Sequence, residues 1–304
     1  MKKINIAGEL SVSEISLGCM RISGLSKKEA NNLINTALEE GIDFFDHADI
    51  YGGGKSEEVF SDAVDMTSSL REKLIIQTKC GIRSGYFDFS KEHILEAVDG
   101  SLKRLKTDYI DVLLLHRPDA LVEPEEVAEA FTRLHESGKV RHFGVSNQNP
   151  MQIELLQKYV KQKLIINQLQ FSITETRLID QGLHLNMNIG ESIDRDGSVL
   201  DYCRLKDITI QAWSPFQYGF FEGVFLDNDK FPELNKKIDE LAQARGVKNT
   251  AIAIAWILRH PARIQPIVGT TNAGRLKDIC KASDISLTRP EWYDIYKAAG
   301  NIIP

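Results

Sequence analysis

Hydrophobic positions along the chain follow two alternating spacings. Short apolar runs, each ended by a polar residue or a glycine, are typical of buried strands, and the stretches between them space apolar residues as on one face of a helix. Strands are predicted at residues 12–17, 42–46, 74–79, 109–115, 140–146, 164–169, 208–213 and 265–268. Helices are predicted at residues 26–40, 56–64, 90–105, 124–137, 150–160, 199–205, 232–244, 250–260, 274–282 and 290–299.

The repetition of strand and helix predicts a parallel sheet, either closed into a barrel or open with helices on both faces. No GxGxxG stretch follows the first strand, which weighs against the open dinucleotide-binding sheet. Eight such units in about 250 residues favour the closed (β/α)8 barrel, the TIM barrel. No linker composition divides the chain, so we expect one domain over residues 1–304, with a short N-terminal hairpin around Gly8 and extra C-terminal helices.

Three connections lack a clear pattern. Residues 171–198 form a long polar stretch that is predicted as a loop, and residues 219–231 form a second connection rich in glycine and aromatics. Long loops of this kind are usually functional or mobile. Together with residues 81–89, they are where we expect the choice of substrate to be made.

Composition and charge restrict the class of protein. A hydrophobic content of 42% is enough for a sizeable core, and a net charge of -6 argues against nucleic acid as the main partner. The cysteines at positions 19, 80, 203 and 280 are far apart, which signals neither a disulfide framework nor a metal site and suits a reducing cytoplasm. The longest apolar helical run, residues 251–258, is too short to cross a bilayer. We therefore expect a cytoplasmic protein with no membrane, nucleic-acid or metal partner.

Chemically active side chains end three consecutive predicted strands. Asp46 ends the second strand, Lys79 the third and His116 the fourth, and Tyr51 follows Asp46 after a few residues. Each has an ordinary explanation when taken alone, such as a helix cap, a solvated lysine or a residue at the rim. In a barrel, however, the carboxyl ends of all strands surround one mouth, where polar residues are typically catalytic.

These four residues can together protonate a carbonyl oxygen while a hydride arrives at its carbon. A free phenol titrates near 10, and we expect the ammonium of Lys79 to lower the pKa of Tyr51 by favouring its charged form. Asp46 would keep Lys79 charged and oriented, and His116 would hydrogen-bond the carbonyl oxygen. This combination predicts general acid catalysis by Tyr51.

Over essentially its whole length the sequence resembles the aldo/keto reductase superfamily, in particular a bacterial subgroup of oxidoreductases. The resemblance rests on Leu17-Gly18, Asp46-His47-Ala48-Asp49-Ile50-Tyr51-Gly52, Thr78-Lys79, Leu114-Leu115-His116, residues 138–147, Asn167-Gln168, Trp213-Ser214-Pro215 and residues 267–272. It implies an (α/β)8 barrel that binds NADPH without a Rossmann motif and reduces a small-molecule carbonyl substrate. It also implies that Asp46, Tyr51, Lys79 and His116 are the catalytic tetrad.

The resemblance further implies a set of cofactor-binding residues. Ser146, Asn147 and Gln168 match positions that bind the nicotinamide carboxamide, Trp213 matches the aromatic that stacks on the nicotinamide ring, and Ser214 matches the pyrophosphate side. The remaining positions expected at the cofactor pocket are Gly18 and Met20 after the first strand, and Gly269, Thr270, Thr271 and Arg275 at the adenosine 2′-phosphate.

Three departures from the family pattern affect these expectations. Hydroxyl groups and the guanidinium of Arg275 suit a phosphate and so support NADP over NAD. Gly269, however, stands where many members have a lysine, so one cation is missing, and Asp278 stands where many contact adenine. Cys19 and Met20 replace a threonine and an aromatic, which gives the substrate pocket a different wall.

Three functions remain open from the sequence. The first is an NADPH-dependent carbonyl reductase, and the second is an NADPH-binding regulatory or redox-sensing protein that turns over slowly. The third is an aldolase that uses Lys79 to form a Schiff base, which the pairing of Asp46 with Tyr51 disfavours.

Overall fold

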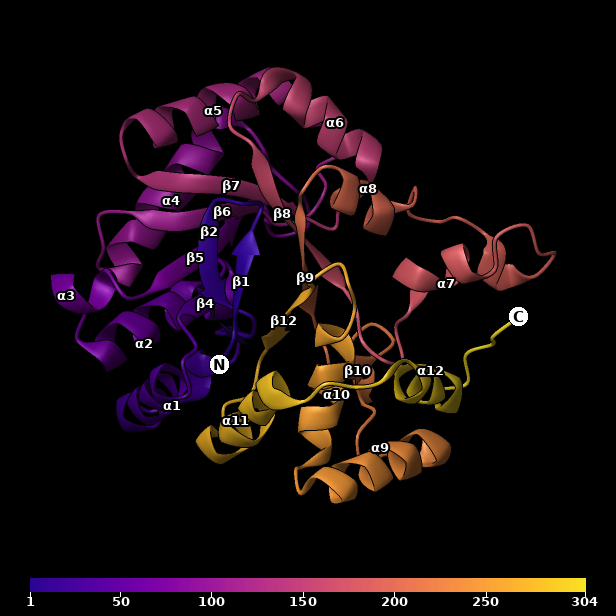
Figure 1. The fold of residues 1–304 in the computed structure, drawn as a ribbon. Coiled ribbons are helices and arrows are strands. Elements are labelled where there is room, and N and C mark those ends of the chain that lie inside the picture. Colours follow the sequence, from indigo (N-terminus) through magenta and orange to yellow (C-terminus); the bar gives the residue numbers. More distant parts are fainter.

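The computed structural model describes residues 1–304, which form a closed barrel of parallel strands surrounded by helices (Figure 1). The strands follow one another around the barrel in the order β12-β3-β4-β5-β6-β7-β8-β9. Their bounds are β3 (Ser16–Gly18), β4 (Phe44–Asp46), β5 (Ile75–Cys80), β6 (Ile110–Leu115), β7 (Val140–Ser146), β8 (Leu164–Gln170), β9 (Thr209–Trp213) and β12 (Gln265–Val268). The predicted (β/α)8 barrel is confirmed, and each barrel strand falls within or beside its predicted range.

Helices separate the strands and cover the outside of the barrel. The helices are α1 (Lys27–Glu39), α2 (Lys55–Val64), α3 (Ser68–Arg71), α4 (Lys91–Leu105), α5 (Pro124–Glu136), α6 (Pro150–Tyr159), α7 (Arg177–Leu183), α8 (Val199–Leu205), α9 (Pro232–Arg245), α10 (Asn249–Leu258), α11 (Ala273–Cys280) and α12 (Arg289–Ala298). Local sequence sets their starts: Ser26 caps α1 in a capping box with Glu29, and the hydroxyl of Ser90 accepts from the backbone N–H of His93 to cap α4. None of the helices has the length and apolar character that crossing a bilayer requires.

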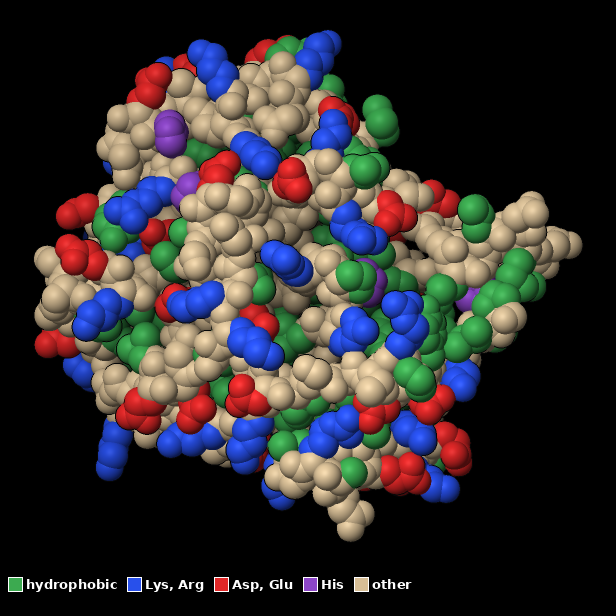
Figure 2. Space-filling view, in the orientation of Figure 1, with side chains coloured by type: hydrophobic (Ala, Val, Ile, Leu, Met, Phe, Trp, Pro, Cys, Tyr) green, Lys and Arg blue, Asp and Glu red, His purple; other side chains and the backbone are tan.

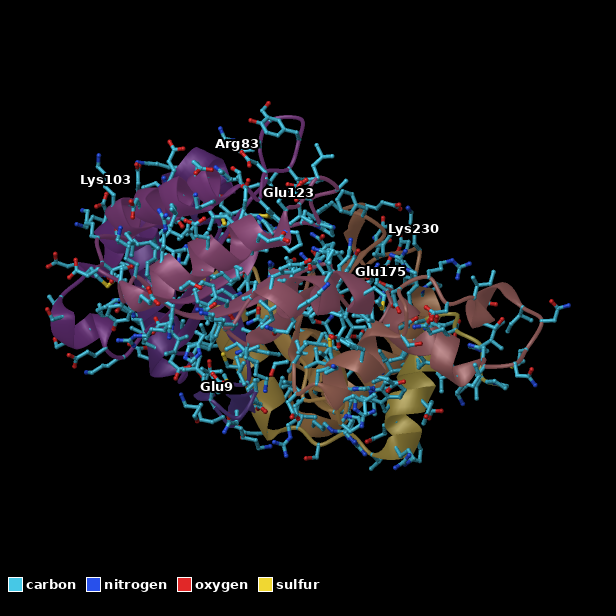
Figure 3. All side chains as sticks on the ribbon, turned by 90° about the horizontal axis from the view of Figure 1, so that it is seen from above. Glu9, Arg83, Lys103, Glu123, Glu175 and Lys230 are labelled. Carbon is cyan, nitrogen blue, oxygen red and sulfur yellow. The ribbon has the colours of Figure 1, made fainter.

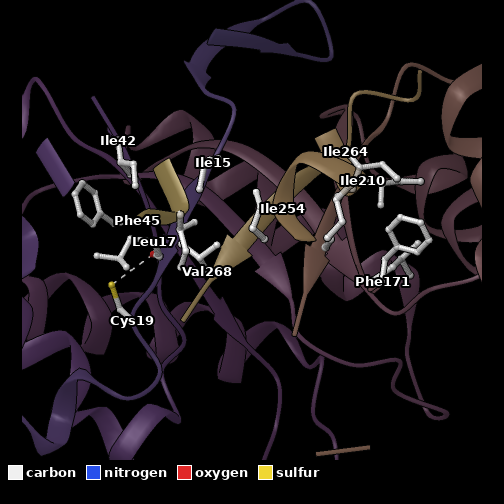
Figure 4. Packing of buried hydrophobic residues seen from close by; sticks show 14 of the residues in the cluster. Ile15, Leu17, Cys19, Ile42, Phe45, Phe171, Ile210, Ile254, Ile264 and Val268 are labelled. Carbon is white, nitrogen blue, oxygen red and sulfur yellow. Dashed lines mark hydrogen bonds between the residues drawn. The ribbon is translucent and has the colours of Figure 1, made fainter. Parts of the chain in front are cut away.

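The main hydrophobic core lies between the barrel and the helices. Figure 4 shows this packing, in which Leu17 of β3 and Val268 of β12 lie close to Ile254 of α10. Strands such as β6, Ile110–Leu115, are buried along their whole length because helices cover one face and other strands line the other. This is why they read as continuous apolar runs in the sequence.

A hairpin of β1 (Lys3–Ile6) and β2 (Leu10–Ser13) precedes the barrel. Ile6 and Val12 from the hairpin form a second apolar cluster with Phe44, Val112 and Leu114 of the barrel strands. In Figure 3 Glu9 of the hairpin lies on one side, and Arg83, Glu123 and Lys230, from connections after β5, β6 and β9, lie towards the opposite side. The hairpin therefore covers the amino end of the barrel and leaves the carboxyl end, its mouth, to the connecting loops.

The connections predicted without structure contain short elements. Within residues 171–198 the chain forms α7 and a 3₁₀ helix at Gly190–Ser192, so the prediction of a loop over the whole range is wrong. Leu178 and Ile179 are buried and Leu183 packs against the core, but seven residues are too few for a helical period to stand out in the sequence. Near residues 219–231 the short strands β10 (Gln217–Tyr218) and β11 (Gly223–Val224) pair antiparallel.

The segment that contains α7 projects from the barrel near α12 in Figure 1. Figure 2 shows hydrophobic side chains gathered beside this segment, whereas acidic and basic side chains are interspersed over the rest of that face. Leu185 and Ile193 of this segment are among the exposed large hydrophobic residues.

Candidate active site

The mouth of the barrel acquires its polar layer from strand alternation. Successive side chains of a strand point to opposite faces of the sheet. Two residues that are two positions apart therefore point to the same face. Phe44 of β4 and Leu114 of β6 belong to the apolar cluster inside the barrel, and Asp46 and His116 follow them two residues later. An apolar layer therefore lies below the layer that contains the predicted site.

The ammonium of Lys79 uses all three of its hydrogen-bond donors. Its Nζ lies 2.8 Å from Oδ2 of Asp46, 2.8 Å from the backbone carbonyl oxygen of His47 and 3.1 Å from the hydroxyl of Tyr51. The Lys79 side chain is completely buried, with 0% of its surface exposed. The structure thus brings Asp46, Tyr51 and Lys79 together, as predicted.

A glycine turn places Tyr51 beside Lys79. Tyr51 opens the 3₁₀ helix Tyr51–Gly54, and Gly52, Gly53 and Gly54 have φ angles of 60°, 64° and 90°. These left-handed conformations cost little only for glycine. The Gly-Gly-Gly run is therefore what allows the chain to turn immediately after Tyr51 and enter α2.

The fourth predicted residue, His116, lies against the ring of Tyr51. The ring centroids are 5.9 Å apart and the rings are nearly perpendicular, at 80°. Burial, followed by the charges of Lys79 and Arg117, holds the pKa of His116 well below its usual value, so the imidazole is neutral at pH 7. A neutral imidazole can still donate one hydrogen bond.

The expectation that Tyr51 has a lowered pKa is wrong for this structure. Burial raises the pKa of Tyr51 above 10.0, and the opposing effect of Lys79 only reduces that increase. Burial also opposes the charge on Lys79, but Asp46 and Tyr51 outweigh it and raise the pKa of the ammonium. Tyr51 is therefore a protonated phenol and Lys79 a charged ammonium at neutral pH, which is the pair needed for proton donation.

Glutamines inside the barrel hold the second oxygen of Asp46. Oδ1 of Asp46 accepts from Gln77 at 2.6 Å and from Gln168 at 3.1 Å, and both of these amides also donate to Oε1 of Gln211, at 2.8 and 3.0 Å. Gln211 in turn donates to Gln265 at 2.8 Å. Strand register explains the network, because Gln168, Gln211 and Gln265 are direct neighbours on β8, β9 and β12.

The network of Gln77, Gln168, Gln211 and Gln265 was not anticipated from the sequence. The family resemblance assigns Gln168 to the nicotinamide carboxamide, yet the amide nitrogen of Gln168 is already bonded to Asp46 and Gln211. Only its carbonyl oxygen remains for a ligand. One sequence feature could have revealed the network. At positions 77, 211 and 265 a polar residue lies on the inward face of an otherwise apolar strand.

A cavity of about 880 Å³ occupies the mouth and is lined by most of the predicted site. Asp46, Tyr51 and His116 line it, while Lys79 lies behind them. The predicted cofactor residues that line it are Gly18, Met20, Ser146, Asn147, Gln168, Trp213, Ser214, Gly269, Thr270 and Arg275. Thr271 does not line the cavity and is exposed beside it.

Hydrogen bonds connect the residues predicted around the nicotinamide. The indole N–H of Trp213 donates to Oδ1 of Asn147 at 3.0 Å, and the amide of Asn147 donates to the hydroxyl of Ser146 at 2.7 Å. That hydroxyl donates to the backbone carbonyl of Gln168 at 3.0 Å. Phe221 stacks on Trp213 with ring centroids 5.8 Å apart, so a second ring stacked on Trp213 would need its other face or a displaced Phe221.

Arg21 is a cavity residue that the sequence prediction missed. Its guanidinium donates two hydrogen bonds to the carbonyl oxygen of Gly269, at 3.1 Å from Nε and 2.6 Å from Nη2. A Cβ atom on Gly269 would lie 3.4 Å from Nη2 of Arg21. A cation from the loop after β3 therefore lies beside position 269, where the sequence has no lysine.

No group of three or more His, Cys, Asp or Glu residues is placed to hold a metal ion, and the four cysteines are free and buried.

Comparison with known proteins identifies the family. The model of the Aldo/keto reductase family matches residues 14–299. The chain belongs to the aldo/keto reductase family. Among the relatives of this aldo/keto reductase, the uncharacterized oxidoreductase YcsN of Bacillus subtilis is 38% identical, and the match covers 98% of each chain. A 6-dehydroglucose reductase of Agrobacterium fabrum is 33% identical, again over 98% of each chain.

Solved structures of aldo/keto reductases have the same fold. The thermostable aldo-keto reductase Tm1743, crystallised with the inhibitor epalrestat, matches with a TM-score of 0.80 and 25% identity over 98% of this chain and 100% of that one. An aldo/keto reductase of Klebsiella pneumoniae, crystallised with NADP and acetate, matches with a TM-score of 0.79 and 23% identity over 99% of this chain and 96% of that one.

Proposed function

We propose that this aldo/keto reductase reduces the carbonyl group of an aldehyde or ketone to an alcohol, with NADPH as hydride donor and Tyr51 as proton donor. The observation that most supports the proposal is the position of the Lys79 ammonium. It lies 2.8 Å from the Asp46 carboxylate and 3.1 Å from the Tyr51 hydroxyl, behind a cavity that Tyr51 lines.

The chemistry of the cavity wall fits NADPH. Trp213 offers an aromatic face, Asn147 offers an amide, and Arg21 and Arg275 offer guanidinium groups suited to phosphate. These groups complement a flat ring with a carboxamide at one end of the ligand and phosphates at the other. When bound, NADPH supplies the hydride that the carbonyl carbon receives.

Tyr51 supplies the proton in the same reaction. The carbonyl oxygen receives the phenolic proton as its carbon receives the hydride, so the product is the alcohol. The nearby ammonium of Lys79 stabilises the negative charge that develops on Tyr51, and Asp46 keeps that ammonium charged and in place. His116 orients the carbonyl oxygen with a hydrogen bond, and water returns a proton to Tyr51 through the open mouth.

The Schiff-base alternative does not fit Lys79. Its nitrogen is fully buried, bonded to three acceptors and absent from the cavity wall. A carbonyl carbon in the cavity cannot reach it without disrupting all three hydrogen bonds.

The test is to mix the purified protein with NADPH and a panel of aldehydes and ketones, and to quantify NADPH loss and alcohol formation together. We expect one alcohol formed for each NADPH oxidised. Tight NADPH binding with negligible turnover of every carbonyl would contradict the proposal and favour the regulatory alternative.

The domain organisation belongs to the same proposal. We propose one domain over residues 1–304, because the hairpin contacts the barrel interior and α11 and α12 pack on α10 and α9. The cytoplasmic location stays a prediction from the sequence.

A further inference from the structure

The guanidinium of Arg117 has no acceptor of its own in the protein. Arg117 follows His116 directly, is half-buried and lines the same cavity as Tyr51. It takes part in none of the side-chain hydrogen bonds or ion pairs of the chain, although most other arginines do. Burial lowers its pKa, as expected when a charge is partly removed from water without a counter-ion.

Aromatic rings hold this guanidinium in place without neutralising it. Its Cζ lies 5.4 Å from the ring centroid of Trp213 and 5.9 Å from that of Phe220. A guanidinium held near aromatic rings by cation–π attraction uses none of its N–H donors on an oxygen acceptor. Arg117 therefore presents a positioned, bidentate-capable donor to the cavity.

The acidic residues of the cavity are engaged elsewhere. Asp46 and Asp227 are the acidic residues that line it. Asp46 is bonded to Lys79 and to the glutamine network, and Oδ1 of Asp227 accepts from Asn249 at 3.0 Å. The charge of Arg117 is thus left for a ligand.

The barrel order separates Arg117 from the proposed phosphate end of the cofactor. Arg117 follows β6, whereas Gly269 and Arg275 follow β12. In the closed ring of strands, three strands separate β6 from β12 in either direction. Arg117 therefore lies across the mouth from Arg275, on the side of His116.

We propose that Arg117 is a substrate-binding residue and that the substrate is an aldehyde or ketone with a carboxylate apart from its carbonyl. This inference rests on the proposed function and adds a substrate class to it. The carboxylate pairs with the edge of the Arg117 guanidinium while the carbonyl oxygen meets Tyr51 and His116. Ile50, Phe87 and Phe220, which line the cavity and are exposed without a ligand, pack against the carbon chain.

The experiment compares a carboxylate substrate with its neutral ester. The kcat/KM values for 4-oxobutanoate and methyl 4-oxobutanoate, each with saturating NADPH, are measured for the wild type, Arg117→Met and Arg117→Lys. Arg204→Met, which removes an arginine of α8 outside the cavity, is the matched control.

We expect the wild type to favour the acid over the ester by about tenfold to a hundredfold, the range for a hydrogen bond to a charged group. Arg117→Met should bring that ratio close to one, mainly by raising KM for the acid. Arg117→Lys should retain part of the preference for the acid, because lysine keeps the positive charge but lacks the planar pair of N–H donors that a guanidinium offers a carboxylate. Arg204→Met should keep the wild-type ratio.

Two results would overturn the inference. One is a wild type that does not favour the acid. The other is an Arg117→Met variant in which kcat/KM falls equally for the acid and the ester while NADPH binding weakens. That result would make Arg117 a cofactor-binding or packing residue.

Binding measurements separate this inference from the proposed function. Pentanoate and pentanamide are titrated into the NADPH-loaded protein by calorimetry. Preferential binding of pentanoate that disappears in Arg117→Met supports the carboxylate site even if no carbonyl is reduced. Equal pentanoate binding by wild type and variant contradicts it even if carbonyls are reduced.

Discussion

The amide of Gln77 on β5 donates to Asp46 on β4 at 2.6 Å and to Gln211, on the distant strand β9, at 2.8 Å. The carboxylate that holds Lys79 with one oxygen is therefore held by the barrel interior with the other. The position of the Lys79 ammonium beside Tyr51 depends on this network as well as on the immediate pair.

Gln77→Leu should lower kcat about tenfold with little change in KM, because Asp46 loses a charge-assisted hydrogen bond that orients it. Its cost to the free energy of unfolding should be about 1–3 kcal/mol, since Asp46 and Gln211 lose a donor in a buried site. Steady-state kinetics and urea unfolding measure both. Gln157→Leu is the control, because it removes hydrogen bonds to the end of α6 and the start of β8. It should lower the free energy of unfolding and leave kcat unchanged. An unaltered kcat in Gln77→Leu would show that the network has no role in orienting the site.

Lys79→Met should reduce kcat by a factor of about 10² or more, in the range for loss of a group that assists proton transfer. It should also destabilise the protein by roughly 3–5 kcal/mol, because the Asp46 charge stays buried without its partner. The double variant Lys79→Met with Asp46→Asn removes that charge. It should recover much of the free energy of unfolding but none of the activity. Recovery of both, or of neither, would contradict the assigned roles.

His47 should make the protein sensitive to acid. Burial, followed by the charge of Lys79, lowers the pKa of His47 to about 3, and neither ring nitrogen has a partner. Below pH ~6.5 the unfolded chain takes up a proton that the folded chain does not accept until about pH 3. The free energy of unfolding should therefore fall by about 1.4 kcal/mol for each pH unit over that window.

His47→Leu tests this dependence, because it removes the titrating group and keeps an apolar contact with Phe60. Urea unfolding between pH 7 and pH 5 should give a shallower decline than in the wild type. A decline remains because burial also lowers the pKa of His93, His116 and His260. His135→Leu, at an exposed site on α5, should retain the wild-type decline. Equal slopes in His47→Leu and the wild type would refute the prediction.

Arg275→Met should weaken NADPH binding by about tenfold to a hundredfold and leave NADH binding nearly unchanged, because only NADPH has the additional phosphate. Arg21→Met should show the same preference if its guanidinium replaces the cation missing at Gly269. Fluorescence titration with both dinucleotides measures the ratio. Lys277→Met, elsewhere on α11, is the control. A parallel loss for NADPH and NADH would contradict the assignment to the 2′-phosphate.

The sequence was sufficient for the barrel and for the cluster at its mouth. The apolar runs mark the strands, and a closed parallel barrel brings all their carboxyl ends together, so Asp46, Lys79 and His116 could be predicted as neighbours. Tyr51 could be placed at the same mouth because it follows Asp46 after only a few residues.

Other features depend on packing that no local pattern records. The glutamine network requires the register between β8, β9 and β12, which is set by closure of the barrel. The raised pKa of Tyr51 reflects its depth of burial, which outweighs the lysine that the sequence suggested would dominate. Arg21 belongs to a loop, and its contact with Gly269 joins segments from opposite ends of the chain.

The most direct test of the account is the kcat of Tyr51→Phe, measured with NADPH and an aldehyde that the wild type reduces. The change removes one oxygen and leaves the ring against His116, so NADPH affinity should be unchanged. We predict a loss of kcat by a factor of about 10² or more, as for removal of a general acid. A Tyr51→Phe variant that keeps wild-type kcat would contradict the claim that the Tyr51 hydroxyl, beside the Lys79 ammonium, protonates the substrate.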